Sequence, residues 1–588
     1  NCPLMPGYGI YEYVGSWINE VGDGVTAWNS LLYSGVGVTT NGSIDIGNCA
    51  GASCQASESI AIGNYAGEYC QGYHSLAVGE GAGQTNQAPL SVAIGRGAAN
   101  YHQNISAVAI GHRAGSCYQN YDSVAVGSHA GQACQNYQAV AVGHSAGRYC
   151  QQDRAVSVGY QAGYGGQCTG AVAIGAFAGQ CGQQYHAIAI GSCAAVEHQQ
   201  WDAIAIGKGA GYYCQQYEAV ALGHLAGQYY QNYRSVALGA RAGRYYQAAE
   251  AVAVGYYAAE CCQRQGAVAV GYYAGRICQG SNAVAVGYCA GTICQHSGAV
   301  SIGYCAGHYQ QSYQAVAVGQ CAGSNAQSYH AVAIGSNAGY CIQQQLATAV
   351  GRGAGYYNQG FGAVAMGHIA GKGCQQNYAV AVGTRAGKCY QQYCAVAVGH
   401  WTGYCGQGRN AVAVGAYAAQ HNQGAYAVAL GSCAAQTPQY IYTLEYNAGD
   451  GLDNTITIAN TYAYSQARPG MYVSGNGYGY PREILSVAIG PSTTVLTLDG
   501  TPDGSVGVGY FTMAAHQGTG AIAIGQYAAQ LVQHPNSIVI NSSGTEAASV
   551  GANTTVIKTL RTVSGTMPSG FHQVAYNPTT GELIVVVS

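Results

Sequence analysis

Residues 251–255 read Ala-Val-Ala-Val-Gly, and residues 187–191 read Ala-Ile-Ala-Ile-Gly. A glycine closes this phrase, or a variant of it, at every sixteenth position from Gly47 to Gly431, without one insertion or deletion. Counted from each of these corner glycines, the third residue is alanine except at Thr402, the fourth is glycine or alanine, and the eighth is always glutamine. A repeat this strict decides the fold.

Sixteen residues are too few for a helical repeat, which needs about 33 residues or more, and too few for a propeller blade. The period suits one coil of a parallel β-solenoid, with two short strands and two tight turns. One coil alone buries too little to offset the entropy of ordering its residues, so stability must come from contacts between neighbouring coils. The sequence therefore predicts an all-β chain, a β-roll in which equivalent residues stack in columns.

The strand before each glycine alternates small and branched residues, which places the branched side chains on one face. We expect Val252 and Val254 to fill the interior of the coil. Ala251 and Ala253 would then face outward, toward something that approaches closely. Three such alanine faces packed around one axis would be buried, which predicts a homotrimer. A single solenoid and an end-to-end filament remain alternatives.

The repeat divides the chain into five segments. Residues 1–42 are not repeats and are expected to cap the first coil or to attach the chain. The solenoid spans residues 43–439 and is followed by an inserted β-domain at 440–508. Coils are expected to resume at 509–541, and a small β tip is expected at 542–588.

The glutamine column is the most regular polar feature of the chain. We expect an amide ladder in which each side chain donates to the carbonyl of the next, and a solvent-facing row for ligand binding is the alternative. The corner glycines are expected where the backbone needs positive φ or a close approach. The ladder residues are Gln55, Gln71, Gln87, Gln103, Gln119, Gln135, Gln151, Gln167, Gln183, Gln199, Gln215 and Gln231, and the corners include Gly63, Gly79, Gly95 and Gly111.

Many of the 24 cysteines also fall in columns. Stacked neighbours would place their Cα atoms about 4.8 Å apart, within the range of a disulfide. Disulfides within or between chains and thiols that act as small apolar filler both remain open. No cysteine pair at two-residue spacing is matched by a second pair, so we expect no metal site. The columns contain Cys54, Cys70, Cys134, Cys150, Cys262, Cys278 and Cys294 at the seventh position, and Cys289, Cys305 and Cys321 at the second.

Aromatic residues stack in the same way. They are expected either to stiffen the solenoid as ring ladders or to form a face that binds sugars or a host surface, because tyrosine combines flat apolar area with a hydrogen-bonding tip. The residues are Tyr185, Trp201, Tyr217 and Tyr233 at the tenth position, and Tyr256, Tyr272, Tyr288 and Tyr304 at the first.

The composition excludes several classes of partner. Only 7% of the residues are charged and the net charge is −3, whereas nucleic-acid binding needs clustered lysine and arginine. No apolar run reaches the roughly 18 residues that span a bilayer, so no membrane insertion is expected. The repeat has almost no carboxylates and only scattered threonines, which argues against a solenoid enzyme and an ice-binding protein. We therefore expect no enzymatic activity and no cofactor.

The phrase at residues 91–95, Ser-Val-Ala-Ile-Gly, and its copies resemble the head repeat of YadA-like trimeric autotransporter adhesins. In that family the repeat forms a left-handed parallel β-roll, three of which pack into a trimer. The longer phrase at residues 283–291, followed by Gln295, is similar to fibre-like proteins of large algal and marine viruses and phages. Those proteins also tend to end with segments like residues 536–541 and 574–582.

The bacterial adhesins end in a heptad stalk and a membrane-anchoring barrel, and this sequence has neither pattern. The resemblance therefore implies a structural fibre, most similar to a virion or phage fibre that presents an adhesive tip for host attachment. A cell-surface adhesin and a self-assembling extracellular filament remain alternatives. The implied setting is extracellular, on the virion or the cell surface. The implied partner is a host receptor or glycan. Because loops on a rigid scaffold carry specificity, we expect the inserted β-domain and the C-terminal tip to make this contact.

Overall fold

The computed structural model describes residues 42–436, 517–529 and 533–541, residue 553, and otherwise only the strands whose bounds are given below. The chain divides into two compact units, Asn1–Leu346 and Ala347–Ser588, which we describe separately. No helix occurs among the described residues, and both units contain parallel β coils of sixteen residues, about 26 turns in all. The predicted β-solenoid is therefore confirmed.

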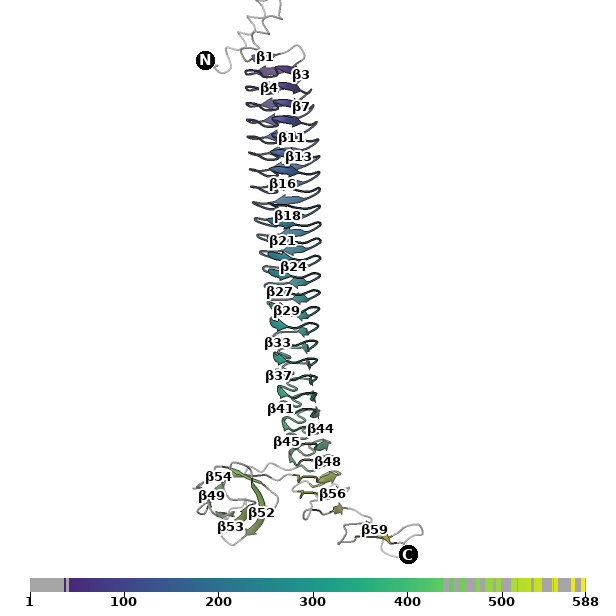
Figure 1. Cartoon of the computed structure of the whole chain (residues 1–588). Coiled ribbons are helices and arrows are strands. Elements are labelled where there is room, and N and C mark those ends of the chain that lie inside the picture. The colour runs from purple at the N-terminus through teal and green to yellow at the C-terminus, as the bar shows by residue number, and fades with distance from the viewer. Residues whose placement is uncertain are drawn as a thin grey trace, which may run out of the picture. The chain divides into compact units, whose positions relative to one another are not determined.

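Each coil of the first unit contributes one strand to each of two parallel sheets (Figure 1). The strands that precede the corner glycines form the valine sheet, and those that end in the repeated glutamine form the glutamine sheet. The valine sheet begins with β2 (Ile44–Ile46), repeats every sixteen residues as in β26 (Val252–Val254), and reaches β36 (Val332–Ile334). The glutamine sheet runs from β3 (Ser53–Gln55) to β15 (Tyr149–Gln151) and from β19 (Glu197–Gln199) to β37 (Cys341–Gln343), and single bridges at Gln167, Gln183 and Cys181 join the two runs.

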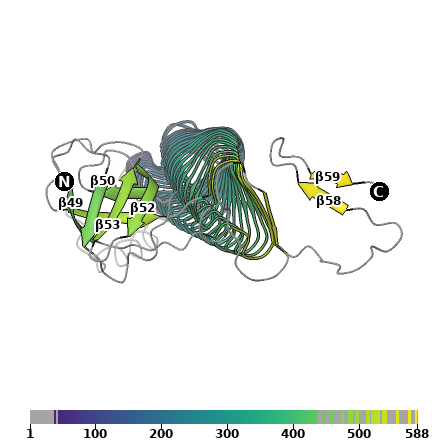
Figure 2. The ribbon, with the colours of Figure 1, turned by 90° about the horizontal axis from the view of Figure 1, so that it is seen from below.

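Neighbouring coils pair in parallel and with a constant register of one repeat. Val252 pairs with Val236 on one side and Val268 on the other, and Gln215 pairs with Gln231. Seen along the stack, successive coils superpose (Figure 2). Equivalent positions therefore form continuous columns. At the open edge of the first coil, β1 (Val36–Val38) pairs antiparallel with β2 and covers backbone groups that would otherwise invite edge pairing.

The interior of the coil differs from the sequence expectation. Ala251 and Ala253, expected to face outward, are fully buried, whereas Val252 and Val254, expected inside, are only half-buried. The reason is the narrow cross-section. The two walls share their interior with the glutamine side chains, which are the largest fully buried groups. In the first unit the strand positions that face them carry alanine or serine, except for Asp45 in the first coil. The argument for a trimer from an exposed alanine face therefore loses its premise.

The corners depend on residues with positive φ at five places in each coil. In the coil that begins at Gly255, φ is 129° at this glycine, 54° at Tyr257, 45° at Ala259, 57° at Cys262 and 64° at Gly266. A side chain in this region costs about 1–2 kcal/mol, yet most of these positions accept ordinary residues. The corner glycine is different, because a Cβ there would lie much closer to the next coil's backbone than van der Waals contact allows.

Steric contact explains the corner glycine column. A Cβ added to Gly95 would lie 2.6 Å from the carbonyl oxygen of Gly111, and one added to Gly63 would lie 2.7 Å from the backbone of Gly79. All four predicted corners have φ between 124° and 130°. Glycine is therefore required at this column both by conformation and by the close approach of the neighbouring coil.

In the second unit the valine sheet runs from β38 (Thr348–Val350) to β48 (Val428–Leu430), and the glutamine sheet from β39 (Tyr357–Gln359) to β47 (His421–Gln423). The chain then leaves the stack. The coil register passes directly from β48 to β55 (Ile522–Ile524), then to β56 (Ile538–Asn541) and β57 (Thr555–Lys558).

Six strands between these coils form one closed antiparallel sheet, in the order β49 (Leu444–Ala448), β50 (Thr455–Ala459), β53 (Thr493–Leu498), β52 (Arg482–Ile489), β51 (Tyr472–Gly475) and β54 (Gly509–Ala514). The segment 509–514, expected to begin the resumed coils, belongs to this sheet instead because β54 pairs with β49 and β51. The column resumes at Gln517, which pairs with Gln423. Gln439, expected to end the first series, lies outside the described residues.

The predicted terminal segments are described only in part. Of residues 1–42, β1 and residue 42 are described, and the predicted cap otherwise lies outside the described residues. Of residues 542–588, the structure describes residue 553, β57 and a two-stranded antiparallel sheet of β58 (Gln573–Tyr576) and β59 (Leu583–Val586).

Candidate functional surfaces of the coil

The repeated glutamines form a chain of hydrogen bonds inside the first unit. The Nε2 of Gln215 donates to the Oε1 of Gln231 at 3.1 Å, and it also donates to the carbonyl oxygens of Ile204 and Ala219 at 2.8 and 2.9 Å. Each glutamine thus joins its own coil to the next and satisfies backbone carbonyls that face the interior. Because both side chains are fully buried, they do not face solvent.

The same bonding recurs along the predicted column with few interruptions. All the predicted glutamines from Gln71 to Gln231 are buried, and Gln55 in the first coil is half-buried. Among the described residues, the Oε1 atoms of Gln87 and Gln517 have no hydrogen-bond partner. Gln517 is the residue at which the chain re-enters the stack.

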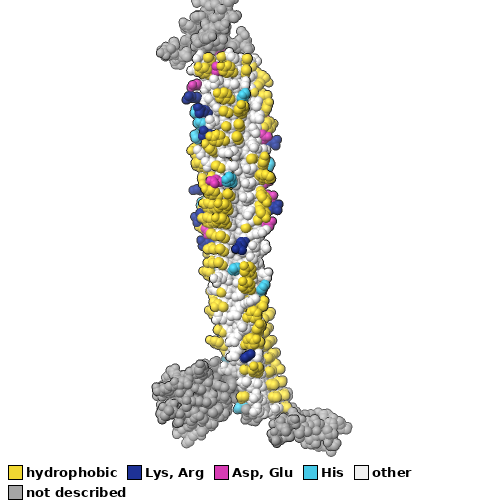
Figure 3. All heavy atoms as spheres, viewed as in Figure 1, with side chains coloured by type: hydrophobic (Ala, Val, Ile, Leu, Met, Phe, Trp, Pro, Cys, Tyr) yellow, Lys and Arg dark blue, Asp and Glu magenta, His cyan; other side chains and the backbone are white. Residues whose placement is uncertain are grey.

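The outward side chains of the valine sheet form a second regular feature, here called the apolar face. It consists of the first and third residues of each strand in that sheet, which are Val, Ile or Leu throughout the first unit. Its most exposed members are Ile110, Ile174, Leu222, Leu238, Ile302 and Ile334, between 37% and 40% exposed. Hydrophobic side chains run in stripes along the coils in Figure 3. Apolar surface of this extent is typical of an interaction site.

The second unit continues this pattern with one polar member. Thr348 stands where other strands carry Val, Ile or Leu, whereas Met366, Val414 and Ile524 are 38% to 44% exposed. Neither of the two outward columns contains a charged residue in the described valine strands from β2 to β56. A partner for this face would therefore gain no charge pairing from it.

The aromatic columns are stacked and accessible. Tyr256, Tyr272, Tyr288 and Tyr304 form a continuous ladder with ring centroids 4.9 to 5.3 Å apart and nearly parallel planes. In the other predicted column, Tyr217 and Tyr233 stack at 5.3 Å, while Tyr185 meets Trp201 edge-on at 6.2 Å. Of these eight residues only Tyr233 is not exposed. The rings both contact each other and present surface to solvent.

The predicted cysteines of the seventh position each occupy the middle of a glutamine-sheet strand, at the surface of the coil. Cys54, Cys70, Cys134, Cys150, Cys262 and Cys278 are exposed, Cys294 is half-buried, and all are thiols in the structure. Their backbone φ values lie between 43° and 60°. Partial burial raises the pKa of Cys134 and of Cys262, and the adjacent thiols of Cys150 and Cys278 add to the effect.

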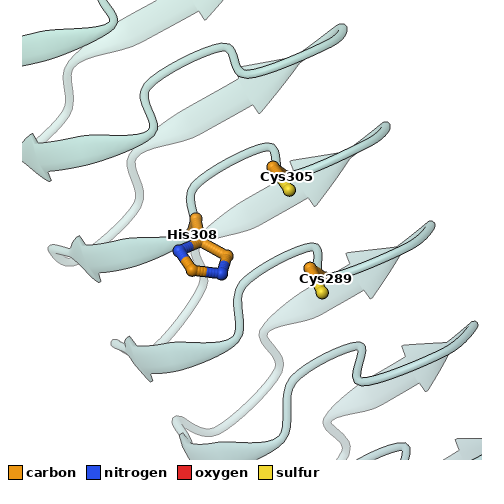
Figure 4. Close-up of side chains that lie close together, drawn as sticks. All are labelled: Cys289, Cys305 and His308. Carbon is orange, nitrogen blue, oxygen red and sulfur yellow. The ribbon is translucent and has the colours of Figure 1, made fainter.

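One cluster combines a cysteine column with a histidine. Cys289 lies in the turn between β30 (Val284–Val286) and β31 (Ile293–Gln295), and Cys305 and His308 lie in the equivalent turn between β32 (Val300–Ile302) and β33 (Tyr309–Gln311). Each residue offers one ligand atom, and these three atoms all lie within 4.8 Å of one another (Figure 4). Burial raises the pKa of both thiols and lowers the pKa of His308.

Sequence reasoning missed this cluster because it searched for paired cysteines two residues apart. In a sixteen-residue solenoid the informative spacing is one full repeat plus the three residues of a turn. Cys289 and Cys305 are one repeat apart, and His308 follows Cys305 by three residues. Reading the sequence in rows of sixteen would have found it.

A thiol pair in the second unit has unusual electrostatics. Cys389 begins β43 (Cys389–Gln391), and it pairs in register with Cys405 at the start of β45 (Cys405–Gln407). A hydrogen bond from Cys405, together with the positive charges of Lys388 and Lys372, lowers the pKa of Cys389 to about 6 although burial opposes the shift. The same hydrogen bond and burial raise the pKa of Cys405.

The part of the chain that the structure describes contains no helix long and apolar enough to cross a membrane. No family model matches the sequence, and neither a curated protein nor a solved structure matches the chain.

Proposed function

We propose that the chain is a structural fibre whose coils act as a spacer and whose other domains make adhesive contacts. The observation that carries this proposal is the buried glutamine ladder. It links each coil to its neighbours at a fixed register, and a stack of equal units of this kind resists bending and local opening better than one held by apolar contacts alone. Such a repeated internal device suits a spacer rather than a single reaction site.

The surface supports the same reading. The ion pairs of the described coils join residues one repeat apart, as Glu218 with Arg234 at 2.8 Å and Glu260 with Arg276 at 2.8 Å. These pairs join neighbouring coils, and we expect no catalytic activity from them. The stacked tyrosines offer flat, accessible area suited to a glycan or a host surface.

We further propose that copies of the chain associate through the apolar face, as three chains if the resemblance to trimeric head repeats holds. Both columns are apolar in the described strands from β2 to β56 except at Thr348, and the most exposed members of the third-residue column, 37–44% exposed, favour burial. The exposed side chains of the apolar face repeat with the strand spacing of about 4.8 Å. A second copy of this chain carries side chains at the same spacing, so its apolar face can pack against the first along the whole stack. The apolar face therefore takes the place of the alanine columns as the proposed contact between copies of the chain.

Among settings, a virion or phage fibre for host attachment is the first candidate, on the strength of the repeat phrase and the terminal segments. Immunogold electron microscopy with antibodies against the coils tests it. Label on appendages of virus particles is the expected result. Label confined to cell surfaces or to free filaments would favour an extracellular adhesin or filament over a virion fibre. Label confined to the cell interior would reject the virion fibre as well as the extracellular adhesin or filament.

Attachment is proposed to reside in residues 440–508 and in the C-terminal segment, since loops and domains on a rigid scaffold carry specificity. The test compares the intact chain with a chain lacking residues 440–514, which removes all six strands of the closed sheet, as competitors of host adsorption. Loss of competition by the shortened chain is expected. Equal competition by both chains would reject this domain as the receptor-binding part.

A further inference from the structure

The cluster of Cys289, Cys305 and His308 is unlike any other place in the described coils. Among the second positions of the repeat, adjacent coils both carry cysteine only at residues 289, 305 and 321, and His308 is the only histidine at a fifth position. The structure brings the two sulfur atoms and one ring nitrogen within 4.8 Å of one another from two neighbouring coils.

We propose that these three residues form a binding site for a thiophilic divalent cation, Zn²⁺, which links two neighbouring coils and keeps one coordination position open. Two sulfur ligands and one imidazole are a donor set that zinc prefers, and three protein ligands leave the fourth tetrahedral position to water or an external ligand. Binding releases the two thiol protons, because thiolates are the ligands.

The geometry requires only a small adjustment. Tetrahedral bonds of about 2.3 Å to sulfur and about 2.0–2.1 Å to nitrogen place the ligand atoms roughly 3.5–3.8 Å apart. The three atoms, now within 4.8 Å, would have to approach one another by about 1 Å. All three side chains are half-buried, so a cation could enter from solvent. Tyr309 packs edge-on against the imidazole, with ring centroids 4.1 Å apart, and restricts the ring's orientation.

The repeat also supplies an internal comparison. Cys305 and Cys321 are likewise one repeat apart, but the fifth position beside Cys321 is Ser324, and Thr292 occupies this position beside Cys289. Hydroxyl side chains at the fifth position are therefore compatible with the coil. His308→Ser removes the imidazole and inserts a residue that the neighbouring coil already accepts, so it is expected to fold.

The test uses the reduced full-length chain and Co²⁺ as a spectroscopic probe for the zinc site, followed by competition with Zn²⁺. The expected result is one Co²⁺ per chain with sulfur-to-cobalt charge-transfer absorption, displaced by Zn²⁺. His308→Ser, Cys289→Ser and Cys305→Ser should each weaken binding more than about 100-fold, since even outer-shell partners are worth about 10–100-fold. Cys321→Ser is the matched control and should bind as the unaltered chain does.

Three results would overturn the site. They are no charge-transfer absorption, absorption that survives His308→Ser unchanged, and a disulfide between Cys289 and Cys305 in the chain as isolated without metal. Circular dichroism of each variant separates loss of binding from loss of folding. This test is independent of the proposed fibre function, because the absorption spectrum reports the bound cation directly.

Discussion

Gln215 donates a hydrogen bond from its Nε2 to the Oε1 of Gln231, one repeat further along the chain, at 3.1 Å, and both side chains are fully buried. Replacing Gln231 by leucine would leave the carbonyl oxygens of Val220 and Ser235 without their side-chain donor and would break the chain of amides toward Gln247. The backbone N–H of Val220 still donates to the carbonyl oxygen of Ser235, so the main loss is the donor to the Oε1 of Gln247 and to the carbonyl of Val220. At about 1–3 kcal/mol for each buried polar group left unpaired, we expect the flanking coils to lose about 2–4 kcal/mol of local stability. Hydrogen exchange of the amides in these coils measures it.

The control for this variant is Gln216→Ala, one residue after the column, where the side chain is half-buried and varies between coils. Its effect should stay within about 0.5 kcal/mol. If both variants opened the coils equally, the ladder would not be what holds neighbouring coils together.

Two glycine positions should respond very differently to alanine. The corner residue Gly255 has a φ of 129°, and a Cβ added to it would lie 2.5 Å from the carbonyl oxygen of Gly271. At Gly243, a fourth-position glycine, the Cβ would lie 2.7 Å from the Oε1 of Gln247, but the next coil accommodates Ala259 at the same position beside its own ladder glutamine. We expect Gly255→Ala to destabilise at least about 2 kcal/mol more than Gly243→Ala. Thermal unfolding of the two variants side by side tests this, and equal melting temperatures would contradict the packing described at the corner.

The first coil should be sensitive to pH through Asp45. This residue occupies a column that holds Ala61 and Ala77 in the next coils, and burial raises the pKa of its carboxyl to about 6, partly offset by a hydrogen bond with Gln55. The usual value is 3.8, so the unfolded chain ionises first as the pH rises. The first coil is therefore most stable below about pH 4 and loses stability up to about pH 6.

Asp45→Ala should remove this loss and stabilise the first coil at neutral pH. The measurement is hydrogen exchange of residues 44–62, corrected for the intrinsic pH dependence of exchange, in both chains at pH 4 and pH 7. A pH dependence that persisted in Asp45→Ala would show that another group is responsible.

Among the thiols of the second unit, Cys389 should react first with an alkylating reagent near neutral pH. Its pKa of about 6 makes it largely thiolate at pH 7, whereas the pKa of Cys405 is raised. We expect a labelling rate that rises with pH and reaches half of its plateau near pH 6, read by mass spectrometry of the peptide. Lys388→Gln removes one of the stabilising charges and should shift the midpoint to higher pH. A midpoint above pH 8 in the unaltered chain would contradict the pairing with Cys405.

The class of fold could be predicted from the sequence, because the constant sixteen-residue spacing of Gly255 and its counterparts is too short for helical repeats or propeller blades. The prediction of the interior was wrong. The alternation of small and branched residues shows that Val252 and Ala253 face opposite sides of the sheet, but it does not show which side faces the interior of the coil. The width of the coil decides that, because beside the buried glutamine most coils accommodate only the small side chain of alanine or serine. In the same way, the phrase at Gly509 has the spacing of a coil, whereas long-range pairing places it in β54. The cluster around His308 depends on which turns stack, so it became visible only once the register was known.

The most direct test of the account is the mass of the intact chain in solution, by sedimentation equilibrium, beside a variant with Leu238→Glu and Val254→Glu on the apolar face. Leu238 and Val254 pair across neighbouring strands and point outward, so the carboxylates should leave the coil folded but prevent burial of the face. We predict three times the chain mass of 60.2 kDa for the unaltered protein and a shift toward one chain for the variant. A single-chain mass for the unaltered protein, or an assembly that tolerates both carboxylates, would contradict association through this face.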